Sequence, residues 1–124
     1  MKKIFTILGF LFAISTFAQN DNGVVSALKT ANVNEFTSYF NSTVDVKLPK
    51  ENEKQNVSKA DAANMVKSFF SSNNINGFEV ISQREMSGTM YIAGKLKSTS
   101  QDYNLTVMLK NKGDGASVIT VRIN

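Results

Sequence analysis

The feature that most constrains the fold is a change of hydrophobic period along the chain. From residue 90 onward, apolar residues occupy every second position in three runs separated by turn-forming residues. Such alternation is typical of half-buried β-strands. A further strand is expected over 78–83, after the turn signal Asn76-Gly77. The positions of the last three strands that we expect to face a core are Met90, Ile92, Leu96, Leu105, Val107, Leu109, Ile119, Val121 and Ile123.

Helical spacing dominates the first half of the chain instead. In 58-SKADAANMVKSFF-70, apolar residues recur on one side of a 3.6-residue repeat, with Ser58 placed as the N-cap and Asp61 in the first turn. Two shorter helices are expected before it, over 24–32 and 33–40. The spacing of Asn32 and Glu35 matches a capping box, and Asn41 is expected to end the second helix.

One strand lies between these helices. Residues 43–48 alternate apolar and polar side chains, Pro49 ends the run, and 50–56 carry no apolar residue and read as a solvated loop. The predicted order is therefore helix, helix, strand, helix and four strands. Early helices followed by an antiparallel meander predict an α+β fold, with about three helices on one face of a curved antiparallel sheet.

The N-terminus has the pattern of a secretory signal peptide over residues 1–18. Lys2 and Lys3 precede an apolar run, and Thr16-Phe17-Ala18 places small residues before a cut between Ala18 and Gln19. An uncleaved anchor is the alternative, but spanning a bilayer takes about 20 predominantly apolar residues and this run is shorter. We therefore predict one soluble domain over 19–124, exported to the periplasm or secreted, and not membrane-integral after cleavage.

Composition narrows the chemistry. The chain has no histidine and no cysteine, so it lacks the usual general base, the thiol nucleophile and the commonest transition-metal ligands. We predict no metal, no cofactor and no assigned catalytic residue. Carboxylate catalysis stays open as an alternative, although Asp45, Glu79 and Glu85 are all expected on the solvent side of their strands.

Charge argues against one class of partner. The net charge is +4 over the whole chain, and it falls to +2 once Lys2 and Lys3 leave with the signal peptide. The remaining charges are scattered between both signs. Nucleic-acid binding normally shows a clustered basic face, so we predict no nucleic-acid partner.

Three motifs resemble a known family. Tyr39-Phe40-Asn41 at the expected end of a helix, the Ala60–Phe70 helix with its terminal Phe-Phe, and Tyr91-Ile92-Ala93-Gly94 resemble domain-of-unknown-function family 4783, which comprises small exported bacterial proteins. That family is similar to the nuclear-transport-factor-2-like and cystatin-like folds. The resemblance implies a cone of helices on a bent sheet, a pocket between them and a sheet face that pairs in dimers.

Two kinds of functional surface follow. The first hypothesis is a non-catalytic exported domain that binds a small apolar ligand or a protein partner. Of the two adjacent phenylalanines Phe69 and Phe70, Phe70 is the one expected to contact the ligand. The alternatives are a carboxylate-based isomerase or hydrolase, and an inhibitor or dimerisation module. The predicted pocket residues are Phe40, Phe70, Met90 and Tyr103. The face predicted to form a sheet-to-sheet homodimer is light in charge and is represented by Tyr91, Thr106 and Met108.

Overall fold

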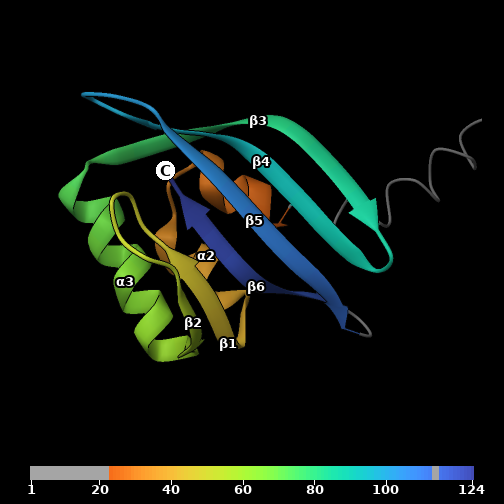
Figure 1. Ribbon diagram of the computed structural model, residues 1–124. Coiled ribbons are helices and arrows are strands. Elements are labelled where there is room, and N and C mark those ends of the chain that lie inside the picture. The colour runs from red at the N-terminus through yellow and green to blue at the C-terminus, as the bar shows by residue number, and fades with distance from the viewer. Residues whose placement is uncertain (1–22, 113–114) are drawn as a thin grey trace, which may run out of the picture.

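The described part of the chain forms a six-stranded sheet with helices packed on one of its faces (Figure 1). The computed structural model describes residues 23–112 and 115–124, so the predicted signal peptide lies outside the described residues. The α+β class is confirmed. The described elements are a first helix over 23–29, α2 (Val33–Ser38), β1 (Phe40–Lys47), β2 (Lys54–Ser58), α3 (Lys59–Ser72), β3 (Ile75–Met86), β4 (Thr89–Ser98), β5 (Tyr103–Lys112) and β6 (Gly115–Ile123).

The sheet is mixed rather than wholly antiparallel. Its order is β2-β1-β6-β5-β4-β3, and every neighbouring pair is antiparallel except β1 and β6. At the start of the parallel pair, the carbonyl oxygen of Tyr39 accepts a hydrogen bond from the backbone N–H of Val118 at 2.8 Å. The first strand is thereby joined to the last, and β1 and β2 extend the meander of β3 to β6 into one sheet with β2 and β3 at its edges.

The two helix starts predicted from capping chemistry are confirmed. Asn32 Oδ1 accepts from the backbone N–H of Glu35 at 3.2 Å, and Ser58 Oγ accepts from that of Asp61, also at 3.2 Å. Each bond satisfies a donor that a helix N-terminus leaves without a partner. The long helix α3 is consequently fixed at the residue where β2 ends.

One hydrophobic core fills the space between helices and sheet. It contains the strand residues predicted to face inward, with Ile92, Leu96 and Leu105 almost inaccessible to solvent. Ile119 is the exception and is only half-buried. The ladder between β5 and β6 shifts register after Met108, so that Val118 takes the inward position. A bulge of this kind moves one residue to the other side of the strand.

Three local predictions are wrong for identifiable reasons. The second helix ends at Ser38 rather than Asn41, because Phe40 already pairs with Val118 in β1. The segment predicted as a solvated loop includes the first three residues of β2, 54–56. The side chains of β2 are almost all exposed and so show no apolar alternation. Asn76-Gly77 lies within β3, and the preceding turn is made at Asn73-Asn74, where Asn74 has a φ of 53°.

A bend in the sheet depends on Gly94. In β3, the pairing with β4 shifts between Val80 and Ser82, leaving Ile81 as an extra residue that is 63% exposed. The strand crosses closely over Gly94 at this bulge, and the Phe78 ring lies against the glycine. The φ angle of Gly94 is ordinary, so backbone conformation does not require a glycine here. The close approach of β3 does.

Candidate functional site

A cleft of about 680 Å³ lies beside α3, between the β1–β2 connection and the start of β5. Its apolar lining consists of Leu48, Pro49, Met65, Phe69 and Tyr103. Its uncharged polar lining consists of Asn64, Ser68, Ser72, Asn73 and Gln101. The charges come from Lys50 and Glu51 of the β1–β2 connection and from Lys54 at the start of β2. Apolar surface with a few polar groups around it is the usual lining of a small-molecule site.

The helix α3 serves the core and the cleft with different rows of side chains. Residues four apart lie one above the other on a helix. The row Ala62, Val66 and Phe70 is buried in the core. The neighbouring row of Met65 and Phe69 is half-buried and lines the cleft. The next row, Asn64, Ser68 and Ser72, is exposed along the same cleft.

A chain of hydrogen bonds holds Tyr103 in place. Its hydroxyl donates to Asn73 Oδ1 at 3.0 Å and accepts from Gln101 Nε2 at 2.8 Å. Asn73 Nδ2 in turn donates to the carbonyl oxygen of Phe69 at 3.0 Å. The rings of Phe69 and Tyr103 meet edge to face, with centroids 5.0 Å apart. This aromatic pair therefore ties the C-terminal end of α3 to β5 and gives the cleft a rigid wall.

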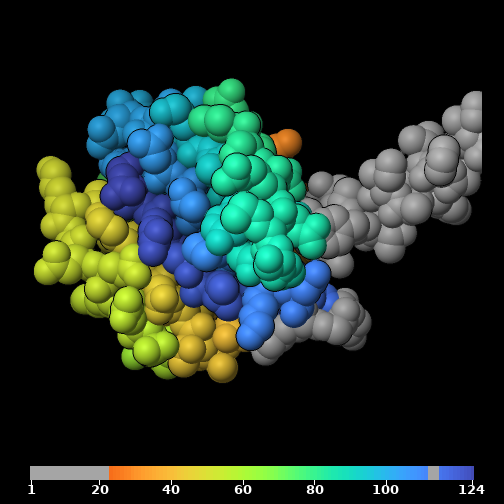
Figure 2. Space-filling view, turned by 45° about the vertical axis from the view of Figure 1, so that its right-hand side comes forward, coloured from red at the N-terminus to blue at the C-terminus, as the bar shows by residue number. Residues whose placement is uncertain are grey.

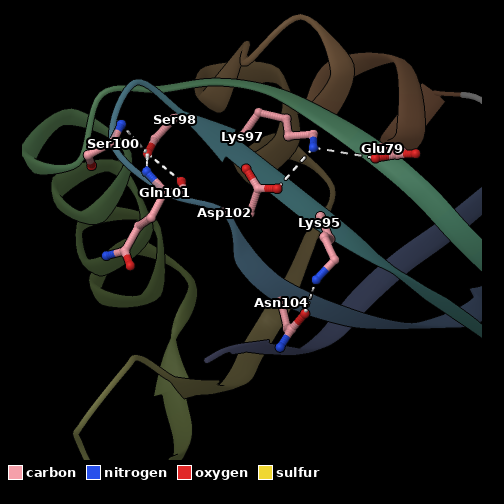
Figure 3. A network of polar contacts seen from close by, with 8 residues as sticks. All are labelled: Glu79, Lys95, Lys97, Ser98, Ser100, Gln101, Asp102 and Asn104. Atoms are coloured by element: carbon pink, nitrogen blue, oxygen red, sulfur yellow. Dashed lines mark hydrogen bonds and ion pairs between the residues drawn. The ribbon is translucent and has the colours of Figure 1, made fainter.

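The turn that carries Gln101 is itself well fixed, as Figure 3 shows. Ser98 Oγ accepts from the backbone N–H groups of Ser100 and Gln101 at 3.3 and 3.1 Å. Beside it, Lys97 Nζ lies 3.0 Å from Asp102 and 3.4 Å from Glu79. The hydrogen bond to Asp102 raises the pKa of Lys97 above its ordinary value, because the carboxylate favours the charged ammonium.

Comparison with known proteins places the chain in a family. A family model described as "Domain of unknown function (DUF4783)" matches residues 21–124. The chain belongs to the DUF4783 family. The crystal structure of a DUF4783 protein from Bacteroides ovatus has a TM-score of 0.75 and 25% identity, and the match covers 82% of this chain and 90% of that one. No curated protein matches the chain significantly.

More distant structures support the fold alone. A nuclear-transport-factor-2-like protein with a long sheet has a TM-score of 0.66 at 9% identity, over 86% of this chain and 98% of its own. An uncharacterised cystatin-fold protein from Novosphingobium aromaticivorans has a TM-score of 0.60 at 11% identity, over 86% and 95%. The DUF4783 domain thus has the nuclear-transport-factor-2-like and cystatin-like architecture that its sequence resembles.

The four predicted pocket residues of the DUF4783 domain lie in different places. Tyr103 lines the cleft. Phe40 and Phe70 are buried and each packs against Phe36, with ring centroids 5.3 and 6.5 Å from it. Met90 is buried in β4, opposite Leu109 of β5. The structure brings Tyr103 together with Phe69 rather than with the other three, and a ligand role for all four stays a prediction.

Sequence reasoning missed most of the cleft of the DUF4783 domain. Phe69, Asn73 and Gln101 were not among the predicted site residues, yet they surround Tyr103. One signal for Phe69 exists in the sequence: Met65 and Phe69 form a row at the border of the apolar stripe of α3, next to Asn64 and Ser68. For Gln101 no such signal exists, because its place depends on how the β4–β5 turn folds.

The three residues predicted for a dimer face do share one face of the sheet. Tyr91 of β4 lies directly opposite Met108 of β5, and Thr106 is two residues along from Met108. All three are half-buried. The alternating residues Ile92 and Val107 are buried in the core that the helices cover, so these three side chains lie on the other side of the sheet, which carries no described helix. In Figure 1 the first helix and α2 lie behind the ribbons of β5 and β6. Pairing between two copies stays a prediction.

The carboxylates of the described residues have structural partners or face solvent. Asp45 Oδ1 accepts from the backbone N–H of Asn56 at 2.9 Å, and Glu53 pairs with Arg122 at 2.9 Å. In the described ranges no side chain of Asp or Glu is buried, and no three of them gather as metal ligands would.

Across residues 23–112 and 115–124, no helix is long and apolar enough to cross a membrane.

Proposed function

We propose that this DUF4783 domain is an exported, non-catalytic binding domain whose cleft takes a small ligand with an apolar face and polar groups along one edge. The observation that carries this proposal is that the five apolar side chains lining the cleft are all half-buried and lie together. Burying such surface against a ligand is favourable by roughly 25 cal/mol per Å².

The polar lining supports the description of the ligand. The exposed row Asn64, Ser68 and Ser72 offers amide and hydroxyl groups that can donate or accept. These groups lie beside Met65 and Phe69, one helical row away. A ligand lying along α3 would therefore place its apolar face on the aromatic wall and its polar edge on this row.

The hydrogen bonds of the Tyr103 hydroxyl fit a binding role better than a catalytic one. The proton of the Tyr103 hydroxyl is committed to Asn73, and its oxygen accepts from Gln101. Glu51, the carboxylate within the cleft lining, comes from the exposed β1–β2 connection. A general acid or base needs a free proton path to the substrate. These contacts favour a preformed surface for recognition.

The cleft is tested by ligand screening with a matched pair of variants. Thermal-shift screening of the mature domain against hydrophobic metabolites is expected to identify compounds that raise Tm. Phe69→Ala should weaken binding of each hit about tenfold or more, because it removes the centre of the apolar wall. Ile81→Ala is the control, since Ile81 is an exposed apolar residue of β3 outside the cleft. A library that yields no hit, or hits that bind Phe69→Ala unchanged, would contradict the proposal.

Export is tested separately. The N-terminal pattern predicts that signal peptidase removes residues 1–18 and leaves Gln19 as the first residue. Intact-mass analysis of the protein recovered outside the cytoplasm of a bacterial host should give the mass of residues 19–124. Full-length protein retained in the cytoplasm would refute the export part and would leave the cleft proposal standing.

A further inference from the structure

The side of the sheet without helices carries an uncharged centre surrounded by cations. The centre is formed by Tyr91 and Ala93 of β4, Thr106 and Met108 of β5, and Thr120 of β6. The pairings Tyr91↔Met108, Ala93↔Thr106 and Met108↔Thr120 place these side chains on one face. Thr120 is only 5% exposed and the other four are half-buried. In Figure 2, β4, β5 and β6 form one continuous surface.

Cationic side chains on the same face surround this centre on several sides. Arg84 lies opposite Tyr91 on β3, and Lys110 lies opposite Thr89 at one end of the strands. Lys95 lies at the other end, opposite Asn104, while Arg122 and Lys47 lie side by side on β6 and β1. Strands are about 4.8 Å apart, so the five strands from β3 to β1 place Arg84 and Lys47 about 19 Å from each other.

The acidic side chains of this face are already engaged. Glu79 and Asp102 pair with Lys97, Glu53 pairs with Arg122, and Asp45 accepts a backbone hydrogen bond. By contrast, Arg84 and Lys110 are exposed and take part in no ion pair within the described part of the chain. Lys95 has an uncharged partner, Asn104 Oδ1 at 3.2 Å (Figure 3). With Lys97 counted, the cations named on this face outnumber its carboxylates, and the excess positive charge lies with Arg84 and Lys110.

One exposed apolar residue, Met86, extends the uncharged centre toward the edge strand β3. Met86 is 50% exposed and lies opposite Thr89, on the same face as Tyr91. Tyrosine, methionine and arginine are enriched in protein–protein interfaces, which typically have an apolar centre and a polar rim. A cationic rim matches an acidic rim on the other side, since complementary charge steers association and suppresses like-charged partners.

We infer that this sheet face is a docking surface for an acidic protein segment that also carries apolar side chains. The apolar side chains of the partner would pack on Tyr91 and Met108, and its carboxylates would meet Arg84, Lys95 and Lys110. A second copy of the chain matches this face less well, because it would bring the same cations toward each other. This inference is independent of the cleft, which lies at α3 and the β1–β2 connection.

The probe for this surface is a short synthetic peptide in which Glu and Leu alternate, titrated into isotope-labelled domain and followed by NMR. We expect shifts centred on Tyr91, Thr106 and Met108, and an affinity that falls with added salt. The double variant Arg84→Glu/Lys110→Glu should lower the affinity about tenfold or more. Tyr91→Ala should also lower it, at unchanged net charge, because the apolar centre is lost.

The controls separate specific docking from general attraction. Lys29→Glu/Lys59→Glu makes the same change in net charge at exposed positions on the helices, and should leave the affinity nearly unchanged. A counterpart peptide of alternating Lys and Leu should not bind. Equal losses in the two double variants, or equal binding of the two peptides, would overturn the inference. A dimer in light scattering that Met108→Glu dissociates, and that the acidic peptide does not displace, would assign the face to a second copy instead.

Discussion

Replacing Gly94 with alanine is expected to lower the free energy of unfolding by about 3 kcal/mol. A Cβ built on Gly94 would lie 2.1 Å from the carbonyl oxygen of Glu79 and 2.8 Å from the Phe78 ring. The backbone oxygen cannot move away without disturbing the β3–β4 ladder, and the ring is part of the core. Either adjustment costs hydrogen bonding or packing.

The measurement is the unfolding transition of the mature domain in urea and on heating. For a domain of this size, the expected loss corresponds to a fall in Tm of about 10 to 20 °C. Gly115→Ala is the matched control, because a Cβ on Gly115 meets nothing within 4 Å. That variant should keep the Tm within a few degrees of the parent. A Gly94→Ala variant as stable as Gly115→Ala would mean that β3 does not cross β4 as described.

Gly94 also shows where sequence reasoning stops. The alternation of β4 predicts correctly that Ile92 and Leu96 face the core. It gives no reason for a glycine between them, because the reason is a bulge on the neighbouring strand. The motif Tyr91-Ile92-Ala93-Gly94 could be matched to a family, yet its physical meaning depends on a contact between residues distant in sequence.

The edges of the sheet were the hardest part to predict. β2 is an edge strand whose residues are nearly all exposed, so it lacks the apolar alternation that identifies a half-buried strand. The parallel pairing of β1 with β6 joins residues more than seventy positions apart, such as Val46 and Val121. Local patterns carry no information on such pairings, whereas the cap at Ser58 is a local feature and was predicted correctly.

The candidate cleft was only partly predictable for the same reason. Tyr103 could be named because an aromatic residue at the inward position of a strand end is a natural pocket residue. Phe69 and Phe70 are adjacent in one apolar stripe, and periodicity alone does not tell which of them turns to the core. That assignment depends on the position of Phe36 on α2, which stacks on Phe70.

Replacing Phe70 with alanine is accordingly expected to cost about 3 to 5 kcal/mol of unfolding free energy. Its side chain is 6% exposed and its ring stacks on Phe36, which in turn meets Phe40 edge to face. Truncation leaves a cavity beside the ring of Phe36, and rigid helices on a sheet can collapse into it only in part. Urea unfolding monitored by circular dichroism measures the loss.

Phe69→Ala is the matched comparison, because it removes the same atoms from the next position of α3. Phe69 is half-buried and packs on Tyr103 at the cleft, so its loss should cost about half as much stability. The binding of any cleft ligand should show the opposite order: strongly reduced in Phe69→Ala and retained in Phe70→Ala wherever that variant is folded. If Phe70→Ala abolished binding at full stability while Phe69→Ala did not, the ligand would lie against the core side of α3 and the cleft would not be its site.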